Sequence, residues 1–556
     1  WKDNSLSAPN WKDLLGNLKL FDFIVANPPF STKAWSNGFN PAEDDYNRFS
    51  YGIPPDKNGD YAFLLHMLTS LKSTGKAAVI LPHGVLFRGG AEGVIRKRIL
   101  QQGYIQAIIG LPANLFFGTS IPACIIILDK AGSAGRKGLF LIDASKGFIK
   151  DGNKNRLREQ DIHKIIDACT QQRELPKFSR LVPLAEIESH DFNLNIPRYI
   201  DTSEAEDLQD IEAHLHGGIP ERDVDALQAY WEVMPNLRSA LFAPQRPGYL
   251  QLKVMQAEIK PSIFAHPEFT SFNQTISGLF DAWRNEHRPR LQNIAIGDRP
   301  KALLNTLAED LLHRFEAAPL LDAYDVYQHL QDYWYATLQD DVYQLVIDGW
   351  QPLIASGPAK GEPNTDLLPP DLIVRRYYAA EAAAIAELEA KRDAISCELE
   401  ELDEEQGSED GPLAEGKTDK GKLTAASVKA RLKAIKKDMD AQEERQALEQ
   451  CQALIEREAE ASKKVKAAQK ALDAKVQSRY AQLSEAELKN LVVDDKWLAT
   501  LQVDVQTELD RVSQALSGRI RQLAERYAAP LPALSAEVEV LAAKVNEHLA
   551  KMGFAV

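Results

Sequence analysis

Short apolar runs bounded by turn residues mark the first part of the chain. They are Phe21–Ala26, Ala77–Leu81, Tyr104–Leu111, Ala123–Leu128 and Leu139–Ile142. Runs of this length are typical of buried strands in a sheet whose faces are both covered. The first run stops at Pro28, because proline has no donor for the strand ladder. We therefore predict a parallel sheet with Asn27 at its carboxyl edge, where open α/β sheets bind ligands.

Helices are predicted between these strands. The apolar residues Tyr61, Leu64, Leu65 and Leu68 recur at helical spacing. This spacing predicts a helix that begins at Gly59 and is terminated by Gly75, since glycine commonly follows a helix end. A second helix is predicted over Asp161–Gln171.

The third and fourth apolar runs are joined by the loop Pro112–Pro122, which contains Phe116 and Phe117. No helical pattern lies between them. A strand, a tight loop and a second strand predict an antiparallel hairpin, which we place at the edge of the sheet.

The remainder of the chain has helical patterns. Residues 201–369 carry Leu and Ala at helical spacing, and Gly357–Pro370 has the composition of a linker. Apolar positions then alternate in three- and four-residue steps on either side of the charged segment Gly407–Gly421. They are Ile385, Leu388, Ile395, Leu399 and Leu402, followed by Val428, Leu432, Ile435 and Met439.

This stepping predicts two long helices folded back as an antiparallel coiled coil. Two roles remain open for it, a subunit contact and a self-contained bundle. After Pro530 a last amphipathic helix is predicted to run to about Met552.

The charge is distributed unevenly. A chain of 556 residues is too long for one core, so we expect three or more domains. The net charge is −15, but residues 1–200 hold 25 Lys and Arg against 19 Asp and Glu, and the rest holds 40 against 61. A basic first domain remains compatible with phosphate contact, which requires a local positive face.

Some protein classes are disfavoured by the sequence. No run of apolar residues is long enough to span a membrane, and Trp1–Asn4 does not resemble a signal peptide. The four cysteines are scattered, without the spacing of a zinc site. We expect free thiols in a cytoplasmic protein.

The segment Asn27-Pro28-Pro29-Phe30 offers specific chemistry. The Asn27 carboxamide oxygen and the Pro28 carbonyl are neighbouring acceptors, which suit the two hydrogens of a planar amino group. Phe30 offers a face for stacking a flat ring. The alternative is a simple proline turn, but the strand directly before the segment favours a clamp for an aromatic amine.

Three nearby features have ordinary alternatives. Residues 31–58 form a long aromatic loop, which either grips a ligand or packs as a lid on the protein itself. His83 follows the second strand, and we interpret it as structural. The cluster Arg96-Lys97-Arg98 either faces phosphate or forms a solvated helix face, and the second is the commoner arrangement.

Four segments, in this order, resemble the modification subunit of type I restriction-modification enzymes: Asn27–Phe30, Gly59–Phe63, Lys76–Pro82 and Leu111–Pro122. The first resembles the motif of amino-group methyltransferases that use S-adenosyl-L-methionine. Two tail segments, Leu368–Val374 and Leu491–Trp497, resemble one branch of the same family. The resemblance is weakest over residues 201–367.

The resemblance implies that residues 1–200 are part of an α/β Rossmann-like methyltransferase domain acting on adenine in DNA. The flipped base would lie between Phe30 and either Phe116 or Phe117, which the sequence does not separate. Asn27 and the Pro28 carbonyl would each accept one amino hydrogen, Pro29 would keep the segment rigid, and Asn27 would adjoin S-adenosyl-L-methionine. No metal is implied.

The resemblance also implies partners, which are DNA, a specificity subunit, a restriction subunit and a second modification subunit, with no membrane. Beyond the first domain we expect an all-α region: a helical domain over 201–369, a coiled-coil hairpin over 370–530 and a C-terminal helix over 531–556.

The sequence departs from the family pattern in one respect. Such enzymes carry a glycine-rich cofactor loop upstream of the Asn-Pro-Pro motif, and none precedes Asn27. We therefore expect a fragment whose front half is missing and which binds the cofactor weakly by itself. The alternative functions are methylation of RNA or of a protein glutamine, and a non-catalytic assembly subunit.

Overall fold

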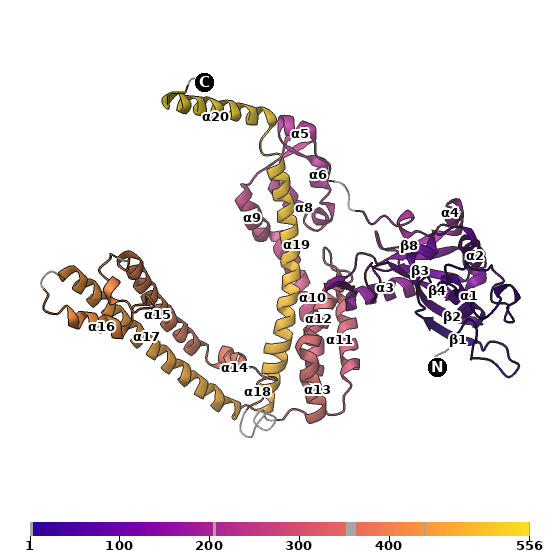
Figure 1. The fold of residues 1–556 in the computed structure, drawn as a ribbon, viewed down its shortest axis with the longest axis horizontal. Helices are drawn as coiled ribbons and strands as arrows, with labels where there is room; N and C mark the ends of the chain where they lie inside the picture. Colours follow the sequence, from indigo (N-terminus) through magenta and orange to yellow (C-terminus); the bar gives the residue numbers. More distant parts are fainter. Residues whose placement is uncertain (1–3, 204–206, 352–362, 409, 439–440, 555–556) are drawn as a thin grey trace. The chain divides into compact units, whose positions relative to one another are not determined.

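The structure is a computed structural model that describes residues 4–203, 207–351, 363–408, 410–438 and 441–554 (Figure 1). Its contacts divide the chain into two compact units. The first comprises Trp1–Phe272, Phe315–Gln331 and Asp510–Val556, and the second comprises Asn273–Arg314 and Asp332–Leu509. The first six residues of the predicted linker, together with Met439, lie outside the described residues. The four-domain division stays a prediction.

A six-stranded mixed sheet lies in the first unit, with the strand order β1-β2-β4-β3-β5-β8. The strands are β1 (Phe21–Ala26), β2 (Leu71–Pro82), β3 (Ile105–Gly110), β4 (Ala123–Asp129), β5 (Gly138–Asp143) and β8 (Ser179–Pro183). All five predicted strands are confirmed. Strand β1 is parallel to β2 and β3 is parallel to β5, whereas β4 is antiparallel to both its neighbours.

This register places the carboxyl ends of β1, β2, β3 and β5 at one edge of the sheet. Asn27 follows β1, His83 follows β2, and the loop with Phe116 follows β3. The predicted functional residues therefore come from neighbouring strand ends.

Two predictions about the sheet are wrong. Strand β1 is an edge strand rather than a buried one, and its Phe23 and Val25 side chains are 78% and 83% exposed. Its apolar residues point to both faces, which is the pattern that suggested burial. The β3–β4 hairpin is antiparallel, as predicted, but it lies inside the sheet because β5 and β8 extend the sheet beyond β3.

The main helices beside this sheet are α1 (Asp60–Thr69), α2 (Gly90–Gln101), α3 (Glu159–Gln171) and α4 (Leu184–Ser189). The predicted helices α1 and α3 are confirmed. Gly75 does not end α1, because it lies within β2. A Cβ atom on Gly75 would lie 2.9 Å from the Phe21 carbonyl oxygen, so this glycine allows β1 to approach β2 closely.

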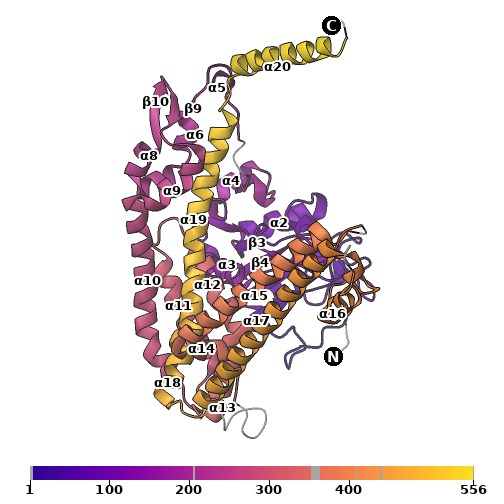
Figure 2. The ribbon, with the colours of Figure 1, turned by 90° about the vertical axis from the view of Figure 1, so that its left-hand side faces the viewer.

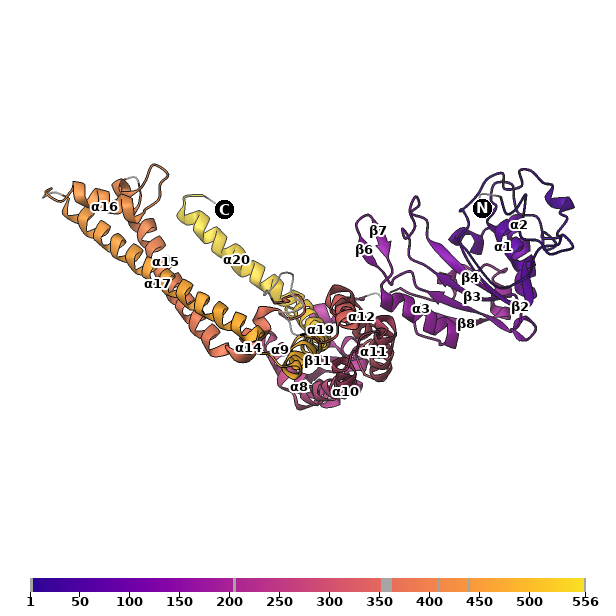
Figure 3. The same ribbon diagram turned by 90° about the horizontal axis from the view of Figure 1, so that it is seen from below.

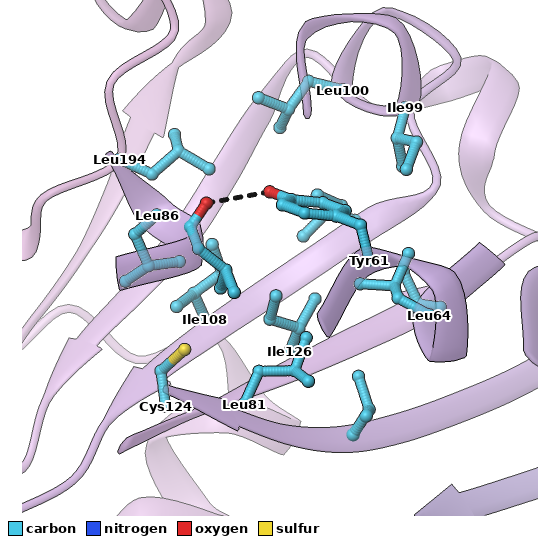
Figure 4. Packing of buried hydrophobic residues seen from close by; sticks show 14 of the residues in the cluster. Tyr61, Leu64, Leu81, Leu86, Ile99, Leu100, Ile108, Cys124, Ile126 and Leu194 are labelled. Atoms are coloured by element: carbon cyan, nitrogen blue, oxygen red, sulfur yellow. Dashed lines mark hydrogen bonds between the residues drawn. The ribbon is translucent and has the colours of Figure 1, made fainter. Parts of the chain in front are cut away.

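Apolar side chains pack on both faces of the sheet. Figure 4 shows one core around Tyr61, whose hydroxyl donates to the Val85 carbonyl oxygen at 2.9 Å. The packed residues include Leu64 of α1, Ile99 of α2 and the strand residues Leu81, Ile108 and Ile126. On the other face Ile165 and Ala168 of α3 join Ile109, Phe140 and Ile142. Helices α1 and α2 therefore cover one face, and α3 covers the other.

The rest of the first unit combines short helices with a small antiparallel sheet. The helices are α5 (Ile211–His216), α6 (Glu221–Asp225), α7 (Gln228–Val233), α8 (Pro235–Leu241) and α9 (Ile259–Ala265), and the strands are β9 (Ile219–Pro220), β10 (Phe242–Arg246) and β11 (Tyr249–Leu252). The helical prediction for 201–369 missed these strands. The predicted C-terminal helix is confirmed as α20 (Leu531–Lys551).

Helices of different lengths form most of the second unit or enter it. They are α10 (Pro267–Gln292), α11 (Pro300–Phe315), α12 (Ala323–Tyr333), α13 (Gln339–Asp348), α14 (Pro370–Tyr377), α15 (Ala379–Gln406), α16 (Ala425–Ala434), α17 (Gln442–Tyr480), α18 (Glu485–Lys489) and α19 (Ala499–Arg526). No helix in the described part of the chain is both long and apolar enough to cross a membrane. All four cysteines are free thiols, as expected.

Helices α15 and α17 lie side by side and antiparallel (Figures 1 and 2). Lys475 binds Glu381 at 2.9 Å, and Ser396 donates to Glu458 at 2.8 Å. The helical hairpin is confirmed, and coiled-coil packing within it stays a prediction. The prediction that Val428, Leu432 and Ile435 begin the second long helix is wrong, because Val428 and Leu432 lie in the short α16, which packs with α15 and α17 at the end of the hairpin.

The second tail segment noted in the sequence, Leu491–Trp497, contains Lys496, which is buried. Its ammonium group lies 2.6 Å from an Asp341 carboxylate oxygen and donates to the carbonyl oxygens of Asp366 and Leu367 at 2.8 and 2.9 Å. The Trp497 indole donates to the same Asp341 oxygen at 2.8 Å. One buried charge pair therefore connects α13 with the 491–497 segment, and Lys496 also binds the two residues just before the 368–374 segment.

Candidate active site

The segment Asn27–Phe30 lies directly after β1. Pro28 is buried, Phe30 is half-buried and Asn27 is exposed. Asn27 is therefore not turned into the core, and its carboxamide is accessible to a ligand. This placement agrees with the expected clamp, whose binding role stays a prediction.

The turn after Phe30 is fixed by the start of α1. Ser31 adopts a left-handed backbone conformation (φ +50°), and its N–H donates to Asp60 at 2.7 Å. The Asp60 carboxylate is fully buried and also accepts a hydrogen bond from Arg88 at 3.0 Å. The Gly59 N–H donates to the Thr32 carbonyl oxygen at 2.9 Å. Helix α1 therefore fixes the position of the clamp segment.

Sequence analysis missed Asp60 as part of the site. The available signal was a charged residue within the apolar helix start Gly59–Phe63. Its partners are 29 residues earlier and 28 residues later in the chain, so only the fold shows what it contacts.

The structure distinguishes the two consecutive phenylalanines: Phe116 contacts Phe30, whereas Phe117 is exposed. The Phe30 and Phe116 ring centroids are 5.7 Å apart and the rings are inclined by 74°, which is edge-to-face contact. Phe117 is 95% exposed. Rings in direct contact leave no room for a flat molecule between them.

A small hairpin supports this loop. Its strands are β6 (Ile149–Asp151) and β7 (Lys154–Arg156). The Lys154 ammonium group donates to three oxygens of the loop, those of the Asn114 side chain and of the Phe116 and Thr119 carbonyls, at 3.0, 2.7 and 3.0 Å. Sequence analysis missed Lys154 as well, because this segment shows no pattern beyond its charge.

The loop 31–58 packs on itself, which is the second of its two predicted arrangements. The Trp35 and Phe49 rings are buried, with centroids 5.3 Å apart. Arg48 is 2% exposed, pairs with Asp44 at 2.6 Å and lies beside His66 of α1 at 3.3 Å. These aromatic side chains serve as a core for the loop.

This contact leads to a pH prediction. Burial and the positive charge of Arg48 lower the pKa of His66 from 6.5 to about 4. Between pH 6.5 and pH 4 the unfolded chain binds a proton at His66 that the folded chain does not bind. The contribution of neutral His66 to the free energy of unfolding is therefore fully present above pH 6.5 and is lost as the pH falls toward 4. We expect a loss of about 3 kcal/mol, at about 1.4 kcal/mol for each pKa unit.

Chemical denaturation of the wild type and of His66→Leu at several pH values between 6.5 and 4 measures this effect. The variant should lose less stability over the range than the wild type does. Equal losses in the two proteins would contradict the assignment to His66.

The side chains of His83 and of Arg96 in the basic cluster are largely enclosed by the protein. Burial lowers the pKa of His83, and its Nε2 atom is buried without a hydrogen-bond partner. Arg96 is 3% exposed and donates to the carbonyl oxygens of Phe192, Val85 and Arg88. Both alternatives for Arg96, phosphate contact and a solvated face, are therefore wrong, because its charge is used inside the domain.

A cavity of about 480 Å³ lies beside β1 and α1. Phe23, Phe63, Met67 and Pro28 are among the residues that line it, whereas the Phe30 and Phe116 rings do not. The cavity therefore adjoins the clamp segment and is separate from the ring pair.

Comparison with known proteins identifies the first part of the chain. Residues 1–208 match the sequence profile described as N-6 DNA methylase. These residues are therefore similar to that family. The match covers the six-stranded sheet, the clamp segment and the Phe116 loop, and it accounts for less than half of the chain.

Three known proteins are similar to part of this chain. The methylase subunit of the type I restriction enzyme MjaVII from Methanocaldococcus jannaschii is 37% identical over 210 residues, which are 35% of this chain and 36% of that protein. The HindI methylase subunit from Haemophilus influenzae is 33% identical over 254 residues, 44% of this chain and 51% of that protein.

The third relative is a solved structure, the methyltransferase subunit of a type I restriction-modification system from Streptococcus thermophilus. It is 42% identical, covers 35% of this chain and 41% of its own, and has a TM-score of 0.32. The chain thus spans only between about a third and a half of the length of each of these relatives.

Proposed function

We propose that this chain is the modification subunit of a type I restriction-modification complex and methylates the N6 amino group of adenine in DNA. The observation that carries the proposal is the contact between Phe30, which follows β1, and Phe116, which follows β3, beside the exposed Asn27. The family match and the names of the relatives support the same reaction.

The proposed chemistry is positioning of the amino group. An adenine flipped from the duplex displaces Phe116 from Phe30 and stacks between the two rings. The Asn27 carboxamide oxygen and the Pro28 carbonyl each accept one amino hydrogen, which directs the nitrogen lone pair out of the ring plane. The buried Asp60 keeps these acceptors in place through Ser31.

The residues present fit one side of S-adenosyl-L-methionine. Asn27 is exposed, and the cavity lined by Phe23, Phe63 and Pro28 adjoins it. Gly16 is the only glycine before Asn27, so a glycine-rich loop is not among these residues. When bound, the cofactor supplies an electrophilic methyl group.

The proposal includes partners and a location. By analogy with the relatives, the chain would act with a specificity subunit that recognises the DNA sequence, a restriction subunit and a second modification subunit. Four free thiols suit the cytoplasm.

The full-length protein, co-expressed with its neighbouring subunits, should transfer tritiated methyl groups from labelled S-adenosyl-L-methionine to DNA. Total host RNA and unmethylated protein extract serve as competing acceptors. Label in N6-methyladenine of DNA supports the proposal. Label confined to RNA or to a glutamine amide would replace it with one of the other amino methyltransferase activities.

A further inference from the structure

The Phe117 side chain lies at the tip of the loop after β3 and is 95% exposed. The next residue, Gly118, has a left-handed φ of +78°, and a Cβ on it would meet no atom within 4 Å, so the backbone turns here in open space. Covering this apolar ring with another apolar surface would be favourable. Its neighbour Phe116 already lies at the proposed base slot.

The tip is held in place by the β6–β7 hairpin, which stands clear of the sheet in Figure 3. Besides the three bonds of Lys154, the Asn155 side chain donates to the Ala113 carbonyl oxygen at 2.7 Å, and the Asn114 side chain donates to the Asn153 carbonyl oxygen at 2.6 Å. Loop and hairpin therefore form one hydrogen-bonded unit, which holds the tip of the loop in a defined position.

The charge of this unit suits a polyanion. Residues 146–158 hold five Lys and Arg side chains and one acidic side chain, Asp151. Lys146, Lys150 and Arg156 are exposed, and Asp151 pairs with Arg156 at 3.3 Å. The net positive charge beside an exposed ring matches duplex DNA, which presents phosphates around an apolar base stack.

We propose that Phe117 enters the DNA duplex and fills the space that the target adenine leaves when it flips, while Phe116 stacks on the flipped base. This inference rests on the proposed function and assigns the two consecutive rings different places. Because the residues are adjacent in the chain, a base in the slot beside Phe116 leaves its vacated position near Phe117. The ring replaces the stacking that the neighbouring base pairs lose.

The test compares two DNA substrates that differ in the cost of flipping. The recognition sequence is first read by single-molecule sequencing of genomic DNA from cells that express the complex. One oligonucleotide duplex carries the paired target adenine, and the other has an abasic site opposite it. Phe117→Ala in the full complex should lower kcat/KM on the paired duplex by about 10- to 100-fold, the range of base–aromatic stacking. On the abasic duplex it should stay within about threefold of wild type.

Three further variants define the result. Phe117→Trp should keep activity on both substrates, and Phe116→Ala should lose activity on both, because it acts on the base itself. Ile166→Ala, which removes an exposed apolar side chain of α3, should change neither. Equal losses of Phe117→Ala on the two substrates, or no loss on either, would overturn the inference. A wild-type complex that methylates neither duplex would instead overturn the proposed function.

Discussion

Replacing Asn27 by alanine should slow methyl transfer to DNA by about 100- to 1000-fold, the usual effect of removing one hydrogen-bonding group that acts in the transition state. In the proposed mechanism the carboxamide accepts an amino hydrogen, and this bond strengthens as the nitrogen lone pair turns toward the methyl donor. The change should appear in kcat rather than in KM for DNA. Because Asn27 is exposed, the melting temperature should not change.

Single-turnover kinetics with the full complex measure this effect. Asn305→Ala, which removes an exposed carboxamide from α11, is the matched control and should retain wild-type rates. Asn27→Asp, which keeps an acceptor oxygen, should fall between the two. Full restriction-modification activity of Asn27→Ala in cells would show that the chain acts as an assembly subunit.

Asp341→Ala should destabilise the second unit by about 3–5 kcal/mol, the cost of leaving one member of a buried ion pair without its partner. Lys496 and Asp341 are 9% and 6% exposed, so water does not compensate for the loss. The substitution also leaves the Trp497 indole N–H without its acceptor. The two carbonyl oxygens beside Lys496 cannot neutralise its charge.

Hydrogen exchange reports this loss locally, which matters because a protein with two units does not unfold in one step. Protection should fall for the amides of 339–348 and 490–498, while the methylase sheet keeps its protection. Asp340→Ala removes the neighbouring exposed carboxylate and should leave exchange unchanged. Unchanged protection in Asp341→Ala would show that the pair contributes no net stability.

Local patterns predicted most of the methylase fold. The apolar runs after the first form strands because their side chains are largely buried in the sheet, and this burial does not depend on which strands lie next to them. The order itself depends on pairing between distant segments, which explains why the β3–β4 hairpin was misplaced at the edge. Strand β1 was misjudged for a related reason, since the apolar character of Phe23 and Val25 does not reveal whether another element covers them.

The sequence pointed to the proposed site through its motif and missed the residues that hold the motif in place. Asn27 and Phe30 could be recognised because their chemistry lies within four consecutive residues. Asp60 and Lys154 act on segments that are 29 and about 40 residues away, and they have ordinary sequence surroundings. Similarly, the heptad steps indicated a helical hairpin, but α17 pairs with α15 through contacts nearly 100 residues apart.

The contact between Phe30 and Phe116 has a consequence for selectivity in the cell. The proposed site for an adenine amine would meet ATP and other free adenine nucleotides, which display the same group. Because the Phe30 and Phe116 rings contact each other directly, a free nucleotide would have to separate them with its own modest stacking energy. A base delivered from bound DNA draws on the affinity of the whole duplex, so soluble nucleotides should be weak competitors.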